Sequence, residues 1–139
     1  MSAVEKEFAS GRMHAILGHN NALSRILVVD DNVKVLNVVS QMLYNVGYRV
    51  DKATGGMDAM RKFSQNNYDV VIADLDMPDM DGFSLGARLR KASPAVKLVI
   101  MTGRCQAEVA HYINSPFIDH WIFKPFRFNE LRSVLKKMC

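Results

Sequence analysis

The sequence predicts a single α/β domain built on a five-stranded parallel sheet with helices on both faces. Short apolar runs alternate with segments in which apolar residues recur at the 3.6-residue period of a helix. The intervals between the runs are too long for hairpins and suit helical crossovers, which are right-handed almost without exception and leave the strands parallel. The chain of 139 residues is long enough to bury one such core.

The first three elements show the pattern most clearly. In the segment from Arg25 to Asp31, an unbroken apolar run follows Arg25 and ends in charge, as expected of a strand buried on both faces. A helix is predicted from Val33 to Val46, and Gly47 supplies its stop signal. The segment from Tyr48 to Ala53 alternates apolar and polar residues, so the second strand is expected at an edge of the sheet.

The remaining elements continue the alternation of strand and helix. They are a helix from Gly56 to Asn66, a strand from Asp69 to Asp74, a helix from Phe83 to Lys91, a strand from Lys97 to Thr102, a helix from Gln106 to Ile113, a strand from His120 to Lys124 and a helix from Phe128 to Met138. The apolar first, third and fourth strands belong in the middle of the sheet. With the second strand at an edge, this favours the strand order 2-1-3-4-5 of a flavodoxin-like, doubly wound fold.

Composition sets the broad class of the protein. Hydrophobic residues make up 49% of the chain and charged residues 23%, which is typical of a globular domain and excludes a disordered chain. No apolar run is long enough to span a membrane, and Met1 to Gly11 lacks the hydrophobic stretch of a secretory signal. Cys105 and Cys139 have neither metal nor redox spacing, so a cytoplasmic location is expected. We expect a flexible extension over residues 1–23 and the folded domain over residues 24–139.

The distribution of charge is more informative than the total. Lys and Arg number 18 against 14 acids, giving a net charge of +4, yet the sequence shows no helix-turn-helix, aromatic strip or basic stripe. Direct binding to nucleic acid is therefore not expected. Six of the 14 acids fall in two short clusters, which are Asp30, Asp31, Asp74, Asp76, Asp79 and Asp81.

Polar residues stand at the carboxyl ends of four predicted strands, where sites form in sheets of this kind. They are Asp30 and Asp31, Asp74, Thr102, and Lys124. Taken singly, most of them would more often be turn, cap or loop residues. Taken together at one edge of the sheet, they predict a functional site.

The residue types at this edge indicate phosphoryl chemistry. Three carboxylates at close range repel one another, and oxygen ligands without Cys or His favour Mg²⁺ or Mn²⁺. Lys124 can hold an oxygen anion, and Thr102 offers a hydroxyl beside the small Gly103. A carboxylate nucleophile, a metal, a lysine and a hydroxyl together predict an aspartyl-phosphate site centred on Asp74.

These motifs resemble the receiver domains of two-component response regulators, from about Ser24 to Met138. The motifs that carry the resemblance are Ile26 to Asn32, Asp69 to Gly82, Ile100 to Gly103, and Lys124 to Phe126. The resemblance implies a phosphoacceptor switch rather than an enzyme acting on an external substrate. The donor would be a sensor histidine kinase or a phosphotransfer protein.

The resemblance also implies a role for each site residue. Asp74 would accept the phosphoryl group, and Asp30 and Asp31 would bind Mg²⁺ together with Asp74 and the backbone carbonyl of Asp76. Lys124 would pair with the phosphoryl group, Thr102 would move to hydrogen-bond it, and the peptide bond between Lys124 and Pro125 would be cis.

The implied output of the switch lies on the fourth helix, the fifth strand and the fifth helix. Trp121, the only tryptophan, occupies the position of the aromatic side chain that changes rotamer when the threonine moves. This face would contact an unknown protein target or form a homodimer.

Two residues depart from the usual pattern of the family. Asp76 stands where many relatives carry a neutral residue, and Arg104 stands two positions after Thr102. We expect Asp76 and Arg104 to tune hydrolysis of the aspartyl phosphate, because both would flank the path of the attacking water.

A phosphatase of the haloacid-dehalogenase type is the alternative. Asp74-Leu75-Asp76 follows an apolar strand, as the nucleophile motif of that family does. Against it, Pro78 stands where that motif has Thr or Val, and the paired acids Asp30 and Asp31 precede the nucleophile.

Overall fold

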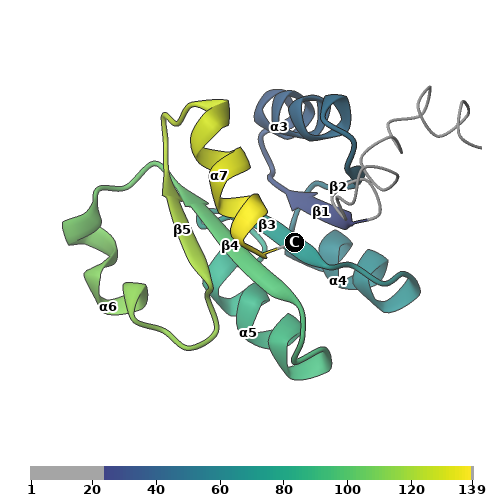
Figure 1. Cartoon of the computed structure of the whole chain (residues 1–139). Coiled ribbons are helices and arrows are strands. Elements are labelled where there is room, and N and C mark those ends of the chain that lie inside the picture. Colours follow the sequence, from purple (N-terminus) through teal and green to yellow (C-terminus); the bar gives the residue numbers. More distant parts are fainter. Residues whose placement is uncertain (1–23, 139) are drawn as a thin grey trace, which may run out of the picture.

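The computed structural model describes residues 24–138; the predicted extension over residues 1–23, and Cys139, lie outside the described residues. Five parallel strands form one sheet in the predicted order β2-β1-β3-β4-β5 (Figure 1). The strands are β1 (Arg25–Val29), β2 (Arg49–Ala53), β3 (Val70–Asp74), β4 (Lys97–Thr102) and β5 (His120–Phe123). The alternating second strand lies at an edge, as its polar residues predict.

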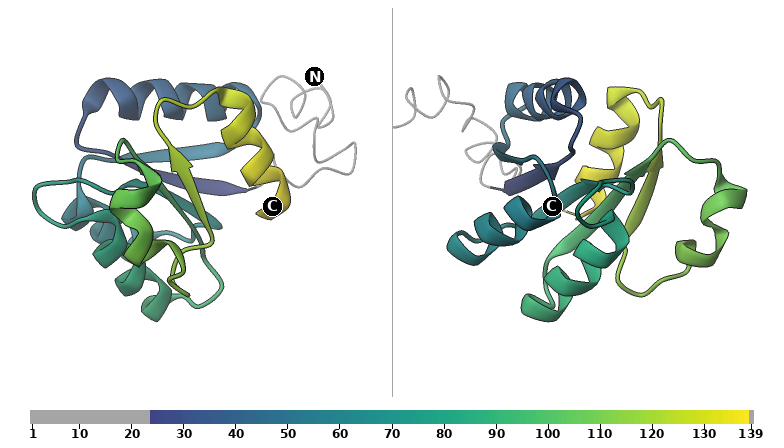
Figure 2. Two further views of the ribbon diagram at one scale, coloured as in Figure 1. Left: turned by 90° about the vertical axis from the view of Figure 1, so that its left-hand side faces the viewer. Right: turned by 180° about the vertical axis from the view of Figure 1, so that it is seen from behind.

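Helices cover both faces of the sheet. They are α3 (Val33–Asn45), α4 (Gly56–Gln65), α5 (Gly82–Ala92), α6 (Ala110–Ile113) and α7 (Phe128–Met138), with a 3-10 turn, η2 (Gln106–Val109), before α6. Helices α3 and α7 lie on one face, α4 and α5 lie on the other, and α6 stands beyond β5 (Figures 1 and 2). Across residues 24–138, no helix combines the length and the apolar character that a membrane crossing requires.

Side chains of the central strands supply both layers of the core. In β1, Ile26 and Val28 pack with the side chains of α3 and α7, whereas Leu27 and Val29 pack toward α4 and α5. Successive side chains of a strand point to opposite faces, so a strand covered on both sides must be apolar throughout. This explains why β1 and β3 read as unbroken apolar runs.

The helices are capped at the edge where the strands end. Asn32 accepts hydrogen bonds from the backbone N of Lys34 and Val35 at the start of α3. Asp81 accepts one from the backbone N of Ser84 at 2.7 Å at the start of α5. These caps satisfy donors that a helix leaves open and fix the loops around the strand ends.

The helix expected from Gln106 to Ile113 is not continuous. The structure forms the 3-10 turn η2 over its first half and only one α-helical turn, α6, over its second. Glu108 closes the turn, because its backbone N donates to the carbonyl oxygen of Cys105 and its carboxylate accepts from the backbone N of Cys105, both at 3.1 Å. The prediction of one regular helix here was wrong.

Candidate functional site

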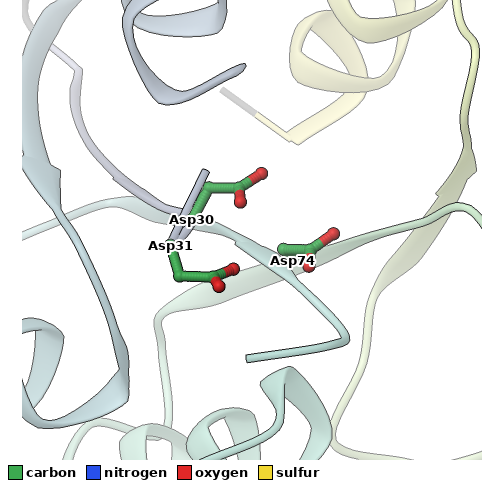
Figure 3. A group of neighbouring side chains, drawn as sticks. All are labelled: Asp30, Asp31 and Asp74. Atoms are coloured by element: carbon green, nitrogen blue, oxygen red, sulfur yellow. The ribbon is translucent and has the colours of Figure 1, made fainter. Parts of the chain in front are cut away.

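Three carboxylates meet at the carboxyl ends of β1 and β3. One oxygen from each of Asp30, Asp31 and Asp74 lies within 4.8 Å of the others. Figure 3 shows the side chains of Asp30 and Asp31 extending toward the strand that carries Asp74. Asp30 and Asp74 are only 1% and 7% exposed, whereas Asp31 is open to solvent. The convergence predicted from strand order is present.

Lys124 supplies the cation of this cluster. It follows β5, and its Nζ donates to Asp74 Oδ1 at 2.7 Å and to Asp30 Oδ2 at 3.3 Å. Its backbone N donates to the carbonyl oxygen of Thr102 at 2.7 Å, which ties the end of β5 to β4. The peptide bond between Lys124 and Pro125 is cis, as the resemblance implies.

Negative charge outweighs positive charge in the cluster. Burial raises the pKa of the Asp74 carboxyl; Lys124 acts to lower it, but the charges of Asp30 and Asp76 add to the rise. Burial acts to lower the pKa of Lys124, yet its hydrogen bond to Asp74 and the charges of Asp74 and Asp30 leave that pKa raised. The raised pKa of Lys124 reflects the carboxylates around it, and such a surrounding favours additional positive charge.

The donor set fits Mg²⁺ or Mn²⁺. The cluster offers carboxylate oxygens only, the ligands that hard divalent cations prefer, and one of its three acids is open to water. Asp30, Asp31 and Asp74 would hold such an ion, which would neutralise charge on a phosphoryl group at this site. The Asp76 backbone carbonyl stays a prediction as a further ligand; the backbone N of Asp76 donates to Asp74 Oδ2 at 3.2 Å.

Thr102, Asp76 and Arg104 lie around the same cluster. Thr102 is fully buried at the end of β4, and its Oγ1 accepts a hydrogen bond from the backbone N of Arg104 at 3.0 Å. The Arg104 side chain pairs with Asp76: Nε lies 3.2 Å from Oδ2, and Nη2 contacts Oδ1. The two residues that depart from the family pattern are therefore direct partners, which the sequence did not predict.

Trp121 lies on the edge strand β5 and is partly buried against the core. Its ring stacks on that of Tyr112 in α6, with centroids 6.4 Å apart. Its buried indole Nε1 makes no hydrogen bond to any residue from 24 to 138. The tryptophan is thus held by ring packing rather than by a polar contact.

An apolar groove of about 390 Å³ adjoins Lys124, and the sequence prediction missed it. Its lining comes from α3 and from the segment after β5, and comprises Lys34, Val35, Val38, Val39, Met42, Lys124, Pro125 and Phe126. Val33 and Val38 on α3 are 55% and 53% exposed. A signal was available in Val38, which lines the groove and lies on the outer side of a helix whose inner face is already apolar.

Comparison with known proteins identifies the family. The family model described as "Response regulator receiver domain" matches residues 26–136. The chain therefore belongs to the receiver-domain family of two-component response regulators, as its motifs, strand order and acidic cluster indicate.

Individual proteins agree with this assignment. The chain is 33% identical to hybrid signal transduction histidine kinase L of Dictyostelium discoideum and to sensor protein EvgS of Escherichia coli K12, over 83% and 81% of its length. The response regulator TrrA from Thermotoga maritima, whose crystal structure is in complex with Mg²⁺-BeF, is also 33% identical in sequence to this chain. It superimposes with a TM-score of 0.77 over 84% of this chain and 99% of TrrA.

The two sensor kinases are much longer than the matched region. This chain spans 7% of the Dictyostelium protein and 9% of EvgS, so the likeness covers only a small part of each kinase. Neither the family match nor these similar proteins support the haloacid-dehalogenase alternative.

Proposed function

We propose that Asp74 accepts a phosphoryl group from a phosphohistidine of a sensor histidine kinase or phosphotransfer protein. The observation that carries this proposal is the pairing of the buried Asp74 carboxylate with Lys124 Nζ at 2.7 Å, inside the acidic cluster. In the transfer, a carboxylate oxygen of Asp74 attacks phosphorus, the P–N bond of the donor breaks, and the imidazole leaves and takes up a proton. The chain itself is the acceptor, and later hydrolysis of its acyl phosphate restores the Asp74 carboxylate and releases phosphate.

Lys124 and Thr102 complete this acceptor. The Lys124 ammonium already contacts Asp74 and has three donors, so it can follow charge onto the phosphoryl oxygens. The Thr102 hydroxyl can donate to another of those oxygens once it turns from the Arg104 backbone. A divalent cation held by the three acids supplies neutralisation of the phosphoryl charge.

Asp76 and Arg104 set the lifetime of the phosphorylated form in this proposal. Their side chains pair beside Asp74, where a water must approach in line with the acyl phosphate. Lifetimes of the labelled wild type, Asp76→Asn and Arg104→Ala proteins test this role. Equal lifetimes in all three would remove both residues from the reaction.

Phosphorylation adds negative charge and acceptor oxygens, and so gives Thr102 and Lys124 new partners. We expect the resulting shift to reach Trp121 and the surface formed by α6, β5 and α7. Binding of a protein target or of a second copy at this surface stays a prediction, as do a cytoplasmic location and the lack of direct nucleic-acid binding.

The groove between α3 and Phe126 is proposed as the place where the protein donor docks. A donor histidine must approach Asp74, and the groove borders Lys124, which contacts Asp74. A Val38→Asp variant keeps the fold because Val38 is 53% exposed. Among a panel of purified histidine kinases, the kinase that labels wild type should label this variant poorly, while phosphoramidate labels both. Equal labelling by that kinase would place docking elsewhere.

The central experiment is phosphoryl incorporation from phosphoramidate, with and without Mg²⁺, in wild type and Asp74→Asn, while the fluorescence of Trp121 is followed. We expect stoichiometric labelling that requires Mg²⁺ and disappears in the variant. Consumption of the donor much faster than the labelled Asp74 is hydrolysed would instead favour a phosphatase. Beryllium fluoride, which accompanies Mg²⁺ in the TrrA structure, serves as a non-hydrolysing mimic of the phosphoryl group.

A further inference from the structure

The pairing of Arg104 with Asp76 joins two loops at the mouth of the site. Asp76 lies in the loop after β3 and Arg104 in the loop after β4, 28 positions later. The guanidinium meets the carboxylate through two nitrogens, the paired geometry for which Arg is better suited than Lys. The two side chains are 43% and 50% exposed, so the pair can open without disturbing the core.

The loop that carries Asp76 is held firmly. The backbone N of Asp76 donates to Asp74 Oδ2 at 3.2 Å. Three residues later, Asp79 accepts hydrogen bonds from the backbone N of Gly56 at 3.1 Å and of Met57 at 2.9 Å, at the start of α4. Asp76 is thus presented from a fixed position.

The loop that carries Arg104 has fewer restraints. Gly103 and Arg104 are exposed, and within residues 24–138 no heavy atom other than those of Gly103 and its two chain neighbours lies within 4 Å of the place that a Cβ on Gly103 would occupy. The backbone N of Arg104 donates to Thr102 Oγ1, while its side chain holds Asp76. Through these two contacts, Arg104 links the orientation of the Thr102 hydroxyl to the fixed loop after β3.

We propose that Arg104 is a positioning residue whose ion pair with Asp76 keeps the Thr102 hydroxyl bound to the backbone N of Arg104 until Asp74 is phosphorylated. Opening of the pair releases the turn from Thr102 to Arg104, so that the hydroxyl can reach the phosphoryl group. The inference rests on the proposed function of Asp74. Exposed ion pairs shift an equilibrium by about two- to fivefold, which is the size of the effect expected here.

For the removal of Arg104, the proposal predicts a change in anion affinity opposite to the change that electrostatics alone predicts. If Arg104 acted only through its charge, its removal would weaken binding of an anion at Asp74. If Arg104 restrains Thr102, its removal frees the competent arrangement in advance and strengthens binding of the same anion.

The test is a titration of beryllium fluoride in the presence of Mg²⁺, followed by the fluorescence of Trp121, the only tryptophan. We expect Arg104→Ala to bind about two- to fivefold more tightly than wild type, and its ligand-free emission to shift toward that of the liganded protein. Asp76→Asn should also bind more tightly, and the double variant no more tightly than Asp76→Asn alone. Arg61→Ala, which removes an exposed arginine paired with Asp58, is the matched control and should behave as wild type.

Weaker or unchanged binding in Arg104→Ala would overturn the proposal. The labelling experiment separates this failure from that of the proposed function. If wild type takes up phosphoryl on Asp74 but Arg104→Ala binds beryllium fluoride no more tightly, only the positioning role is lost. If wild type takes up no phosphoryl group, the proposed function itself fails.

Discussion

Asp79 caps α4, a helix that begins 23 positions before it in the chain. Its Oδ2 accepts a hydrogen bond from the backbone N of Met57 at 2.9 Å, and its Oδ1 accepts one from the backbone N of Gly56 at 3.1 Å. Gly55, the residue that directly precedes α4, has no side chain to provide a cap. These two hydrogen bonds hold the pKa of the Asp79 carboxyl below its ordinary value. A single carboxylate thereby fastens the loop after β3 to a neighbouring helix.

Replacing this cap should destabilise the whole domain. Asp79→Ala is expected to lower the free energy of unfolding by about 1 kcal/mol, because two helix donors lose their acceptor. The free energy of unfolding of Asp79→Asn should lie between those of Asp79→Ala and wild type, since the amide retains one acceptor oxygen. Urea unfolding at neutral pH measures the three values. If the urea midpoint of Asp79→Ala equals that of wild type, water replaces the carboxylate as acceptor without loss of stability.

Mg²⁺ should stabilise the protein through the acidic cluster. At about 100 times its Kd, an ion that binds only the folded state adds about 2.7 kcal/mol. Asp31→Asn should abolish most of this gain, because it removes the one acid of the cluster that is open to solvent. In EDTA the same variant should be more stable than wild type, because like-charge repulsion in the cluster falls.

The distinctive outcome is that wild type and Asp31→Asn exchange their order of stability between EDTA and Mg²⁺. Thermal unfolding in both conditions measures this order. Asp69→Asn is the control, since Asp69 precedes β3 at the opposite end of the strand and an amide can still accept from the backbone N of Arg25. Equal Mg²⁺ stabilisation of wild type and Asp31→Asn would show that Asp31 is not a ligand.

Strand order and the acidic cluster could be predicted from the sequence, and the reason is geometric. Apolar strands separated by helical segments force a parallel sheet, and the carboxyl ends of its strands share one edge. Asp30, Asp74 and Lys124 needed only their places at strand ends to be brought together. The acidic cluster therefore follows from the hydrophobic period of the sequence and the topology of the sheet alone.

Contacts between loops could not be predicted in the same way. The pairs Asp76 with Arg104 and Asp79 with Met57 depend on how loops bend, which has no period in the sequence. The break after Val109 depends on Glu108 turning back to its own loop rather than extending a regular helix. Local hydrogen bonds of polar side chains compete with helix formation, and only the folded geometry shows which arrangement forms.

A second carboxylate network supports the sheet away from the site. Asp51 on β2 accepts hydrogen bonds from the Tyr68 hydroxyl at 2.6 Å and from Arg25 Nη2 at 2.8 Å. Burial acts to raise the pKa of Asp51, but these hydrogen bonds and the charge of Arg25 outweigh it and leave the pKa below 3.8. Burial, followed by the hydrogen bond to Asp51, raises the pKa of Tyr68 to about 12.

Tyr68→Phe should therefore cost stability in a pH-dependent way. At neutral pH we expect a loss of about 1 kcal/mol from the missing hydrogen bond. A carboxyl with a lowered folded-state pKa contributes stability above its ordinary value of 3.8 and loses it as pH falls through the lower folded value, so the difference from wild type should shrink in acid. Tyr44→Phe, at a tyrosine that is 67% exposed, is the control. If the difference in the free energy of unfolding between Tyr68→Phe and wild type stays constant as the pH falls, the contribution of Tyr68 does not depend on the charge of Asp51.

Two glycines beside the site should respond differently to the same substitution. A Cβ on Gly82, the first residue of α5, would lie 2.4 Å from the backbone oxygen of Asp74, a contact that no rotamer can relieve. Gly82→Ala should therefore destabilise the protein by about 1–3 kcal/mol, as overpacking does. Gly103→Ala meets open space and should stay within about 0.5 kcal/mol of wild type.

Urea unfolding compares the two alanine variants, and a Mg²⁺ titration adds the functional consequence. Because the added methyl of Gly82→Ala would press on the backbone of Asp74, we expect the end of β3 to shift and to disturb the place of the Asp74 carboxylate in the acidic cluster. Mg²⁺ binding should weaken in Gly82→Ala and remain at the wild-type level in Gly103→Ala. Equal stability and equal Mg²⁺ affinity in both variants would show that α5 can retreat from β3 freely. The position of Asp74 would then be fixed by its own strand, and not by the helix that follows it.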